Sequence, residues 1–587
     1  MSNAQATGQA QAGIPDPSNR PWLRHYDPAV PATITYPDKP LTWLLDEAAR
    51  THGNRDAMIF YGHRFTYREL AAMVDRFAGA LVNLGIKPGD RVSIALPNIP
   101  QFPVAFYGVL KAGAVAVPTN PIYTEAELQH QLADAGAETI IVLDLLYPKL
   151  QKVRANTPMK HIIVAGVQDY LPPLLAAGYA VQQRRNKQAT ASKRELRADP
   201  TVHQFKELLS KPDERWYELH ALPEPAKPED VAVLQYTGGT TGLSKGAMLT
   251  HRNLLANAMQ VWSWTGLQDT TTTHETMFCA APFFHSYGLT VAMNAGLFSG
   301  STLVLMPRYK ARDAVKMIQK YHPTLFPGVP TMYLGINREI EEHSGDLHSV
   351  RICISGAAPL PKEVQNTFEQ LSGGKMVEGY GLTETSPVTH CNPLNGERRT
   401  GIGLPFPDTE ATIQDQETGK MLPPGQPGEI CIRGPQVMKG YWNRPEETAS
   451  MLRGGWLHTG DIGIMDEDGY FQVVDRAKDM IIASGYKIFP REVEEVLYAH
   501  PKVAEAVLIG IPDEYRGESA KAYIVLKPGQ QATADEIISF TKERLAPYKL
   551  PKQVEFRSEL PKTMIGKVLR RALREEEAAK QAQKTAD

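Results

Sequence analysis

Cysteine is scarce in this chain of 587 residues, which contains only Cys279, Cys353, Cys391 and Cys431. These residues stand far apart, and none belongs to a C-x-x-C pair. Their spacing argues against a disulfide framework and against a zinc site built from paired cysteines. Since thiols stay reduced in the cytoplasm, we expect the protein to act there.

The chain also lacks the pattern of a secretory signal. Its first residues, MSNAQATGQAQAGIPDPSN (1–19), contain no basic start followed by an apolar core. No apolar run reaches the roughly 18 residues that a membrane-spanning helix needs. We therefore expect a disordered N-terminal tail and no transmembrane segment.

No excess of charge of either sign is present. The chain has 63 Lys and Arg against 65 Asp and Glu, a formal net charge of −2. A global field that would attract nucleic acid is thus missing. Any anionic ligand must be bound by local groups.

One internal stretch has almost no charge at all. From Asn253 to Pro307 there is no Lys or Arg, and only Asp269 and Glu275 carry negative charge. Such a stretch is typical of buried core. As a set, its residues could also line an apolar tunnel, and both interpretations stay open.

Helical and strand patterns alternate along the first two thirds of the chain. The stretch 66–98 begins with the capping box Thr66-x-x-Glu69, continues with helical apolar spacing and ends in a short Val/Ile strand. The next stretch repeats this order around a second capping box, Thr124-x-x-Glu127. This alternation predicts an α/β fold with mostly parallel sheets.

The pattern changes after about residue 405, where short strands broken by Gly and Pro predict a small antiparallel β unit. Beyond Asp479 the pattern is α+β, and the charged link DRAKD (475–479) is the expected boundary. We expect a large N-terminal lobe of βα subdomains with a small β-barrel-like unit, followed by a small mobile α+β C-terminal domain. The expected divisions are a tail and lead-in at 1–39, an N-terminal domain at 40–475 with its β unit at about 405–475, a C-terminal domain at 476–575 and a tail at 576–587.

Residues 170–198 combine an apolar segment, YLPPLLAAGY, with a basic one. The basic segment contains a single acidic residue, Glu195, among Arg184, Arg185, Lys187, Lys193, Arg194 and Arg197. An apolar patch beside a basic cluster can rest on an anionic membrane surface. A solvated insertion loop explains the same residues equally well.

The segment YTGGTTGLSKGAMLTH (236–251) follows an apolar run and is rich in Gly and Thr. A Gly-rich turn after a strand can direct backbone N–H groups at a phosphate, with hydroxyls and a Lys adding donors and charge. The same residues match the G-x-S-x-G nucleophile elbow of serine hydrolases around Ser244. That elbow places its Ser at the strand end, whereas Thr237 to Leu243 separate Ser244 from the apolar run. The segment does not match a Walker A loop. That loop needs Gly directly before its Lys and Ser or Thr directly after it, whereas Ser244 precedes Lys245 and Gly246 follows it. A flexible surface loop explains the abundance of Thr poorly.

Six further segments follow in order: PFFHSYG (282–288), SGAAPLP (355–361), GYGLTETSP (379–387), GGWLHTGDIG (454–463), DRAKDMIIASGYKIFPREVEE (475–495) and LPKTMIGKVLRR (560–571). Each alone has a plain structural explanation. His285 and Tyr380 fit a buried core, Gly356 to Ala358 fit close packing, and Glu384 fits a solvated helix start. Chance would rarely place all six in this order.

Together these segments resemble the adenylate-forming enzymes, the superfamily of acyl-CoA synthetases, luciferases and nonribosomal-peptide adenylation domains. The resemblance covers about residues 40–575. GGWLHTGDIGIMDEDGYFQVVDRAKDMI is similar to the fatty-acyl-CoA synthetase signature, and the bacterial long-chain fatty-acid–CoA ligases are the nearest group. The resemblance implies that ATP activates a fatty carboxylate as acyl-AMP, with Mg²⁺ bound, and that the CoA thiol then takes the acyl group.

The resemblance also implies a role for individual residues. Glu384 is similar to the magnesium-holding carboxylate, Thr383 to the residue that reaches the α-phosphate, and His285 to a gate near the carboxylate. Lys567 matches the lysine that bridges the carboxylate and the α-phosphate. The remaining residues implied in binding ATP or CoA are Thr237, Gly238, Gly239, Thr240, Thr241, Gly242 and Lys245 on the β- and γ-phosphates, Gly356, Ala357, Ala358, Gly379, Tyr380 and Gly381 around the adenine, Asp461 and Arg476 on the ribose, Lys478 as the hinge, and Gly485 in the pantetheine channel.

The expected enzyme is thus an AMP-forming fatty acid–CoA ligase whose substrates are a fatty acid, ATP and CoA. We expect a cytoplasmic enzyme with a long-chain substrate and no nucleic-acid partner. Contact with the inner face of the membrane through 170–198 stays open beside the solvated-loop interpretation. A medium-chain or aryl ligase, an enzyme that loads a carrier protein, a serine hydrolase using Ser244 and a non-catalytic binding protein are the alternatives. The sequence leaves open the chain length, the pathway, the CoA nucleotide site, the oligomeric state and the tunnel gate, for which Trp262, Trp264 and Tyr287 are candidates.

Overall fold

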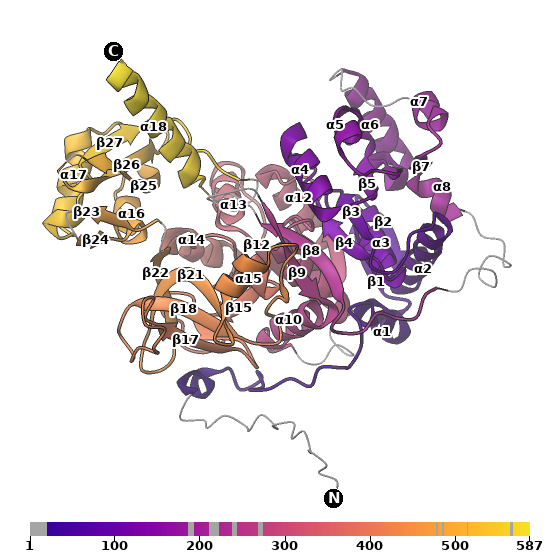
Figure 1. The fold of residues 1–587 in the computed structure, drawn as a ribbon, viewed down its shortest axis with the longest axis horizontal. Coiled ribbons are helices and arrows are strands. Elements are labelled where there is room, and N and C mark those ends of the chain that lie inside the picture. The colour runs from indigo at the N-terminus through magenta and orange to yellow at the C-terminus, as the bar shows by residue number, and fades with distance from the viewer. Residues whose placement is uncertain are drawn as a thin grey trace, which may run out of the picture.

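The computed structural model describes residues 20–185, 193–210, 222–237, 244–267, 274–476, 479–483, 486–513, 515–563 and 568–586. Figure 1 shows a large lobe that runs from indigo to orange and a smaller yellow C-terminal domain at the upper left. Two mixed sheets, one small antiparallel sheet and a C-terminal sheet form the framework. The predicted α/β fold with a large lobe and a smaller C-terminal domain is confirmed.

The first mixed sheet has eight strands in the order β19-β9-β8-β4-β3-β5-β6-β7. Its strands are β3 Arg91–Ala95, β4 Val115–Pro118, β5 Thr139–Leu143, β6 His161–Ala165, β7 Val202–Gln204, β8 Val231–Thr237, β9 Lys245–Thr250 and β19 Gly440–Tyr441. From β8 to β7 all neighbours are parallel, whereas β9 is antiparallel to both β8 and β19.

The second mixed sheet has nine strands in the order β16-β15-β14-β13-β12-β10-β11-β1-β2. Its strands are β1 Asp56–Phe60, β2 His63–Thr66, β10 Thr276–Cys279, β11 Thr302–Leu305, β12 Leu325–Gly328, β13 Ile352–Ser355, β14 Lys375–Gly381, β15 Val388–Cys391 and β16 Leu404–Pro405. The neighbours from β14 to β1 are parallel, and the pairs at both edges are antiparallel.

Helices cover both faces of each mixed sheet. One continuous apolar core joins the two sheets through α1 Trp43–His52, α2 Tyr67–Asn83, α3 Gln101–Lys111, α8 Phe205–Ser210, α10 His251–Trp264 and α11 Ala295–Phe298. The outer face of the first sheet packs on α4 Glu125–Ala135 and α5 Tyr147–Val153, and that of the second on α12 Ala311–Tyr321, α13 Pro330–His343 and α14 Lys362–Ser372. The large lobe therefore stacks helices and sheets in alternating layers.

Both predicted capping boxes are present. The Thr66 side chain accepts the N–H of Glu69 at the start of α2, and the Glu69 carboxylate accepts the N–H of Thr66. Thr124 and Glu127 make the same reciprocal bonds at the start of α4. These bonds satisfy N–H groups that have no partner within the helix, so they mark each helix start in the sequence.

The segment 253–307 is largely buried wherever the structure describes it, as its lack of charge predicts. It contributes α10, β10, the π-helix η6 Gly288–Asn294, α11 and β11. Its buried carboxylate, Glu275, is paired with Arg351 at 2.6 Å. The prediction of an apolar tunnel stays a prediction.

A small antiparallel sheet follows the nine-stranded sheet in the chain, in the order β17-β18-β21-β20 with β22 paired to β21. Its strands are β17 Glu410–Gln414, β18 Gly428–Arg433, β20 Leu452–Arg453, β21 Trp456–Met465 and β22 Phe471–Arg476, and α15 Pro445–Met451 lies between β19 and β20. The Gly- and Pro-broken segments after residue 405 thus form the predicted antiparallel unit.

The C-terminal domain has its own sheet and its own apolar core. It contains β23 Ile481–Ala483, β24 Tyr486–Ile488, α16 Pro490–Tyr498, β25 Val503–Asp513, β26 Gly517–Leu526, α17 Ala534–Lys542, β27 Gln553–Phe556 and α18 Arg570–Ala586. It contacts the large lobe where α16 packs against β22. Its mobility and the boundaries expected from the sequence stay predictions.

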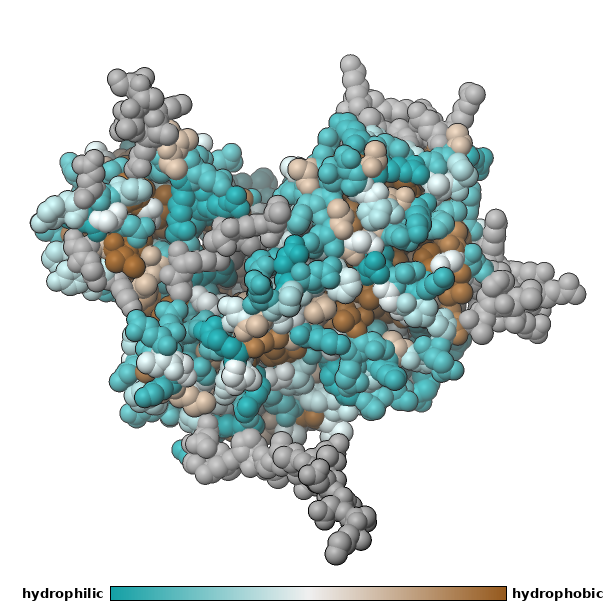
Figure 2. Space-filling model, viewed as in Figure 1, coloured by the Kyte–Doolittle hydropathy of each residue, from teal (hydrophilic) through white to brown (hydrophobic). Residues whose placement is uncertain are grey.

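The insertion predicted at 170–198 forms α6 Pro173–Arg185 and α7 Lys193–Ala198, with 186–192 outside the described residues. Leu174 and Leu175 at the start of α6 are 89% and 48% exposed. Figure 2 shows small separate apolar patches, not one continuous apolar face, on the side of the molecule that it draws. Within the described residues, no helix has both the length and the apolar character needed to cross a bilayer.

Candidate functional site

The strand ends of the nine-stranded sheet place several predicted residues along one edge. Because β12, β13 and β14 are parallel, their carboxyl ends meet there. Gly356 to Ala358 follow β13 directly, and Gly379 to Gly381 end β14. Ligands in open α/β sheets bind outside the carboxyl ends of the strands, so this edge is the expected position of a site.

A hydrogen bond connects the eight-stranded sheet to the same region. Gln235, near the end of β8, donates from Nε2 to the carbonyl oxygen of Phe284 at 2.9 Å. Phe284 lies in the segment 282–288, which follows β10. The end of β8 therefore lies beside the segment that carries His285.

The Gly/Thr segment connects β8 to β9, which pair as an antiparallel hairpin with Thr237 opposite Lys245. Gly238, Gly239, Thr240, Thr241 and Gly242 lie outside the described residues, and their predicted role stays a prediction. Ser244 is followed by strand β9, not by a helix. A nucleophile elbow needs a strand-to-helix turn, so this arrangement disfavours the serine-hydrolase interpretation.

Tyr441, which lies outside the predicted motifs, contacts both Lys245 and Glu384. Lys245 Nζ lies 5.5 Å from the centroid of the Tyr441 ring and pairs with Glu447. The Tyr441 hydroxyl donates to Glu384 Oε1 at 2.6 Å. Burial and the nearby Glu384 carboxylate raise the pKa of Tyr441, so its hydroxyl stays a donor. Tyr441 thus lies between Lys245 and Glu384, which belong to segments far apart in the sequence.

Tyr441 and Glu447 belong to GYWNRPEE, a segment that sequence reasoning did not select. Its only local signal is the Gly440-Tyr441 pair before Pro445. The pairing of β19 with β9 brings that pair to Lys245, and strand pairing over such a separation is not visible in a local pattern.

Thr383 and His285 lie in neighbouring segments. Thr383 Oγ1 is 3.5 Å from the Oγ of Ser286, the residue after His285. His285 Nδ1 accepts the backbone N–H of Tyr287 at 3.3 Å. The π-helix η6 begins at the next residue, and such helices occur frequently at functional sites.

Two glycines of the strand ends allow close packing that a side chain would prevent. A Cβ on Gly356 would lie 2.5 Å from the ring of Tyr287, and one on Gly381 would lie 1.8 Å from the carbonyl oxygen of Pro387. Ala357 has a φ of +68°, in the left-handed region. Strained backbone of this kind is often found at functional sites.

Three predicted nucleotide-binding residues form a direct cluster. Tyr380 donates its hydroxyl to Asp461 Oδ2 at 2.7 Å, and Arg476 Nε lies 3.1 Å from Asp461 Oδ1. Asp461 is 4% exposed. Burial and the Asp461 carboxylate raise the pKa of Tyr380, so the phenol stays protonated. The cluster joins the end of β14 to the small antiparallel sheet.

The predicted residues of the C-terminal domain lie outside the described residues. These are the hinge Lys478, the channel residue Gly485 and the lysine Lys567. Among the described residues on either side of the lysine segment, Lys562 and Val568 form an isolated antiparallel bridge. The roles of the three residues stay predictions.

Two α/β sheets whose strand ends share one site, a small antiparallel sheet and a separate C-terminal domain define the class of adenylate-forming enzymes. The model of the AMP-binding enzyme family matches residues 45–442, and that of the AMP-binding enzyme C-terminal domain matches residues 492–567. The chain belongs to this family.

Known relatives resemble the chain over nearly its whole length. A long-chain-fatty-acid–CoA ligase of Bacillus subtilis is 46% identical over 561 residues, which are 95% of this chain and 98% of that protein. A feruloyl-CoA synthase of an Amycolatopsis species is 37% identical over 528 residues, 90% of this chain and 96% of that protein. The crystal structure of an anthranilate CoA ligase with anthranoyl-AMP has a TM-score of 0.79 and 26% identity, and the match covers 93% of this chain and 98% of that one.

Proposed function

We propose that this protein is an AMP-forming fatty acid–CoA ligase with a preference for long-chain substrates. The observation that carries the proposal is the cluster of Tyr380, Asp461 and Arg476, close to a strand end that also presents Thr383 and Glu384. A carboxylate between a phenol and a guanidinium can accept both hydroxyls of a ribose. The 46% identical relative named as a long-chain-fatty-acid–CoA ligase supports the same reaction.

A fatty acid needs activation because oxide is a poor leaving group. In the first half-reaction a carboxylate oxygen attacks the α-phosphorus of ATP, the bond to the β-phosphate oxygen breaks, and acyl-AMP and pyrophosphate form. Two anions must approach each other, so cationic and hydrogen-bonding groups have to offset their repulsion. In the second half-reaction the CoA sulfur attacks the acyl carbon and AMP leaves.

The described residues supply part of this environment. Asp461 orients the ribose with Arg476, and the Gly356 to Ala358 segment forms a wall for the adenine. Thr383 offers a hydroxyl to the α-phosphate. Lys245 supplies positive charge for the outer phosphates, and its ion pair with Glu447 would open when they bind.

Glu384 fits the role of a magnesium ligand. Its Oε1 is held by Tyr441, while Oε2 has no hydrogen-bond partner within the described part of the chain. Mg²⁺ is usually bound through one or two carboxylates together with substrate phosphates and water. The ion would neutralise charge on the phosphates during attack.

The C-terminal domain would supply a different group to each half-reaction. Lys567 neutralises charge where carboxylate and α-phosphate meet, and a turn about Lys478 then replaces it with the segment around Gly485. A glycine there would permit close approach of pantetheine. His285 would act as a gate beside the acyl carboxylate.

Location and substrate length follow from the same proposal. A cytoplasmic enzyme that rests on the inner membrane face through 170–198 could collect its substrate from the bilayer. The uncharged, buried segment 253–307 could wall a tunnel for a long acyl chain. The second candidate function is an aryl-CoA ligase, which the 37% identical feruloyl-CoA synthase favours.

Release of AMP from a panel of acids, assayed with and without CoA, tests the proposal. The panel runs from hexanoate to stearate and includes ferulate and benzoate. We expect CoA-dependent AMP release that is fastest with the long fatty acids. A higher kcat/KM for ferulate would instead establish the aryl function, and turnover of esters without ATP would contradict both.

A further inference from the structure

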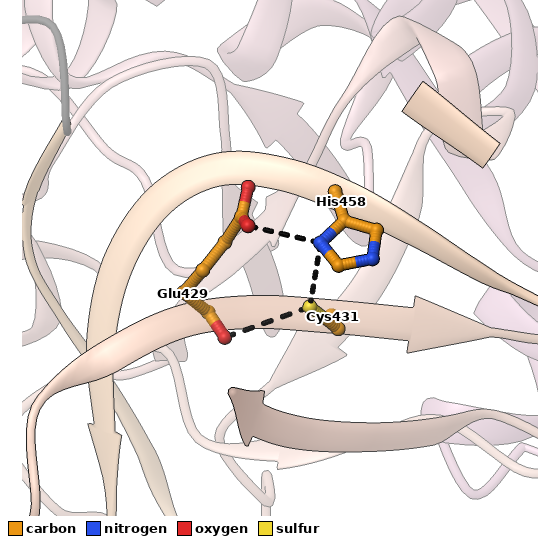
Figure 3. Close-up of side chains that lie close together, drawn as sticks. All are labelled: Glu429, Cys431 and His458. Carbon is orange, nitrogen blue, oxygen red and sulfur yellow. Dashed lines mark hydrogen bonds and ion pairs between the residues drawn. The ribbon is translucent and has the colours of Figure 1, made fainter. Parts of the chain in front are cut away.

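The small antiparallel sheet contains a buried cluster of Glu429, Cys431 and His458, on β18 and β21 (Figure 3). His458 Nδ1 lies 2.9 Å from Glu429 Oε2 and 3.3 Å from Cys431 Sγ. All three residues are buried, and Cys431 is fully so. Burying a carboxylate is costly unless hydrogen bonds or opposite charges compensate for lost water, so its partners matter.

The Glu429 carboxylate has a donor at each oxygen. Oε1 accepts the backbone N–H of Gly460 at 2.9 Å. Oε2 accepts from Arg453 Nη2 at 3.2 Å and from His458. Because a carboxylate only accepts, Nδ1 of His458 carries the hydrogen. Burial, followed by the nearby Glu429 charge, raises the pKa of Cys431 to about 12, so the thiol is neutral.

The Glu–Cys–His set resembles a zinc site in its chemistry, but its partners favour another role. A zinc ion would compete with the Gly460 N–H and the Arg453 guanidinium for the carboxylate. It would also need the lone pair at His458 Nδ1, where the hydrogen now points to Glu429. The cluster is therefore satisfied as a hydrogen-bonded network.

The network lies beside an irregularity in β21. Glu429 pairs with Ile462, whereas Cys431 pairs with His458, so Thr459 to Asp461 face Ile430 alone. Gly460 has a φ of +70°, which favours glycine. The Thr459 hydroxyl donates to the Ile430 carbonyl at 2.8 Å and accepts the N–H of Asp461 at 3.1 Å. Bulges of this kind redirect the side chains that they carry.

We infer that Glu429 is a positioning residue for the nucleotide: it holds the Gly460 peptide, and thereby directs the Asp461 carboxylate towards Tyr380 and Arg476. At the bulge, the Gly460 N–H donates to the Glu429 carboxylate. His458 and Arg453 hold the Glu429 side chain in turn. The inference rests on the proposed function, in which Asp461 accepts the ribose hydroxyls.

The test compares ATP with 2′-deoxyATP in pyrophosphate exchange, which measures the first half-reaction. The parent should have a kcat/KM about 10- to 100-fold higher with ATP than with 2′-deoxyATP. This ratio corresponds to the free energy of one hydrogen bond to a charged group. Asp461→Asn should lose most of this preference. Glu429→Ala should also lose most of it, with a smaller effect on kcat at saturating ATP.

Glu429→Gln should retain most of the preference, because its amide oxygen can still accept the Gly460 N–H. Glu429→Met fills a similar volume without an acceptor, and it serves if the alanine variant does not fold. Glu410→Gln is the control, since it weakens ion pairs to Arg433 and Arg20 in the same sheet but away from the bulge. It should behave as the parent.

The outcomes separate the inference from the proposed function. If Asp461→Asn keeps the preference for ATP, the proposed nucleotide site is wrong. If Asp461→Asn loses it while Glu429→Ala and Glu429→Met keep it, Glu429 acts through stability alone and the inference is overturned. Stoichiometric zinc in the purified parent, lost in Glu429→Ala, would likewise overturn it.

Discussion

Glu378 of β14 and Arg491 of α16 lie 3.7 Å apart across the contact between the large lobe and the C-terminal domain. Both side chains are largely buried, at 15% and 17% exposed. Burial raises the pKa of Glu378 to about 7, and Arg491 opposes part of this rise. Because Glu378 faces Arg491 of the C-terminal domain, protonation of Glu378 is linked to the contact between the two lobes. Glu378 also directly precedes Gly379, in the segment that carries Tyr380.

Glu378→Gln should make stability less dependent on pH. The folded state binds the Glu378 proton up to a pKa of about 7, against 4.5 for the ordinary group, so the parent loses stability as pH rises between these values. The loss is about 3 kcal/mol at most. Because the variant has no such proton, its thermal midpoint relative to the parent should rise by a few degrees between pH 5 and pH 8. Glu341→Gln, an exposed change on α13, is the control. An equal difference at both pH values would contradict the shift.

Tyr441→Phe should impair the ATP-dependent step selectively. The change removes the donor to Glu384 Oε1 and leaves the ring beside Lys245. A hydrogen bond to a charged group contributes about 1.5–3 kcal/mol, so kcat/KM for ATP should fall by about one to two powers of ten. Conversion of supplied acyl-AMP and CoA should change little. Tyr61→Phe, between β1 and β2, controls for the loss of a hydroxyl. An unchanged kcat/KM in Tyr441→Phe would show that Tyr441 has no role in the ATP-dependent step.

Several parts of this fold were predictable because their signals are local. A capping box is a pair of hydrogen bonds between residues three apart, so Thr66 with Glu69 and Thr124 with Glu127 are visible in the sequence. The contacts of Lys245 with Tyr441, of Glu378 with Arg491 and of Glu429 with Gly460 depend on strand pairing or domain packing. No local pattern encodes them.

Motifs predicted residue types better than they predicted partners. The resemblance named Tyr380, Asp461 and Arg476, and the structure brings these three together. It did not indicate that the Tyr380 hydroxyl bonds to Asp461. The wide spacing of cysteines excluded paired-cysteine sites, but it could not show that Cys431 packs against His458.

Ser244→Ala should lower activity only modestly. Ser244 stands before a strand, and a hydroxyl beside bound phosphates contributes about 1.5–3 kcal/mol, whereas the loss of a nucleophile would abolish nearly all turnover. ATP-dependent AMP release by the parent and the variant measures the effect. Complete inactivation of the variant, together with ester hydrolysis by the parent without ATP, would restore the hydrolase interpretation.

The start of α6 should contribute to membrane binding. Leu174 and Leu175 are exposed, while Tyr170 packs against Phe65 and Leu196 is buried, so substitution is cleaner than deletion of 170–198. Leu174→Ser with Leu175→Ser should reduce co-sedimentation with phosphatidylserine vesicles. Binding of the parent should weaken as salt rises, because exposed charges are screened over about 8–10 Å. Ile122→Ser, another exposed apolar change, is the control. Equal binding by the parent and the double variant would leave 170–198 as a solvated insertion.

Lys567→Ala and Gly485→Leu should separate the two half-reactions. Lys567→Ala removes a cation needed where carboxylate and α-phosphate meet, so acyl-AMP formation should fall by several powers of ten, each of about 1.4 kcal/mol in barrier. Thiolation should survive, because the anhydride then already exists. Gly485→Leu should do the reverse, since a bulky side chain would block pantetheine without touching Glu384 or Asp461.

Pyrophosphate exchange measures the first step of these variants, and quenched-flow thiolation of synthetic acyl-AMP measures the second. Lys562→Ala is the matched control for Lys567, because Lys562 belongs to the same sequence segment, LPKTMIGKVLRR, but is paired with Glu505 at 2.5 Å. Gly485→Ala should give a smaller loss of thiolation than Gly485→Leu, since the side chain is shorter. If both main variants remain folded by circular dichroism and lose both steps in equal proportion, a single fixed site serves the whole reaction. The hypothesis that the C-terminal domain rotates between the half-reactions would then be contradicted.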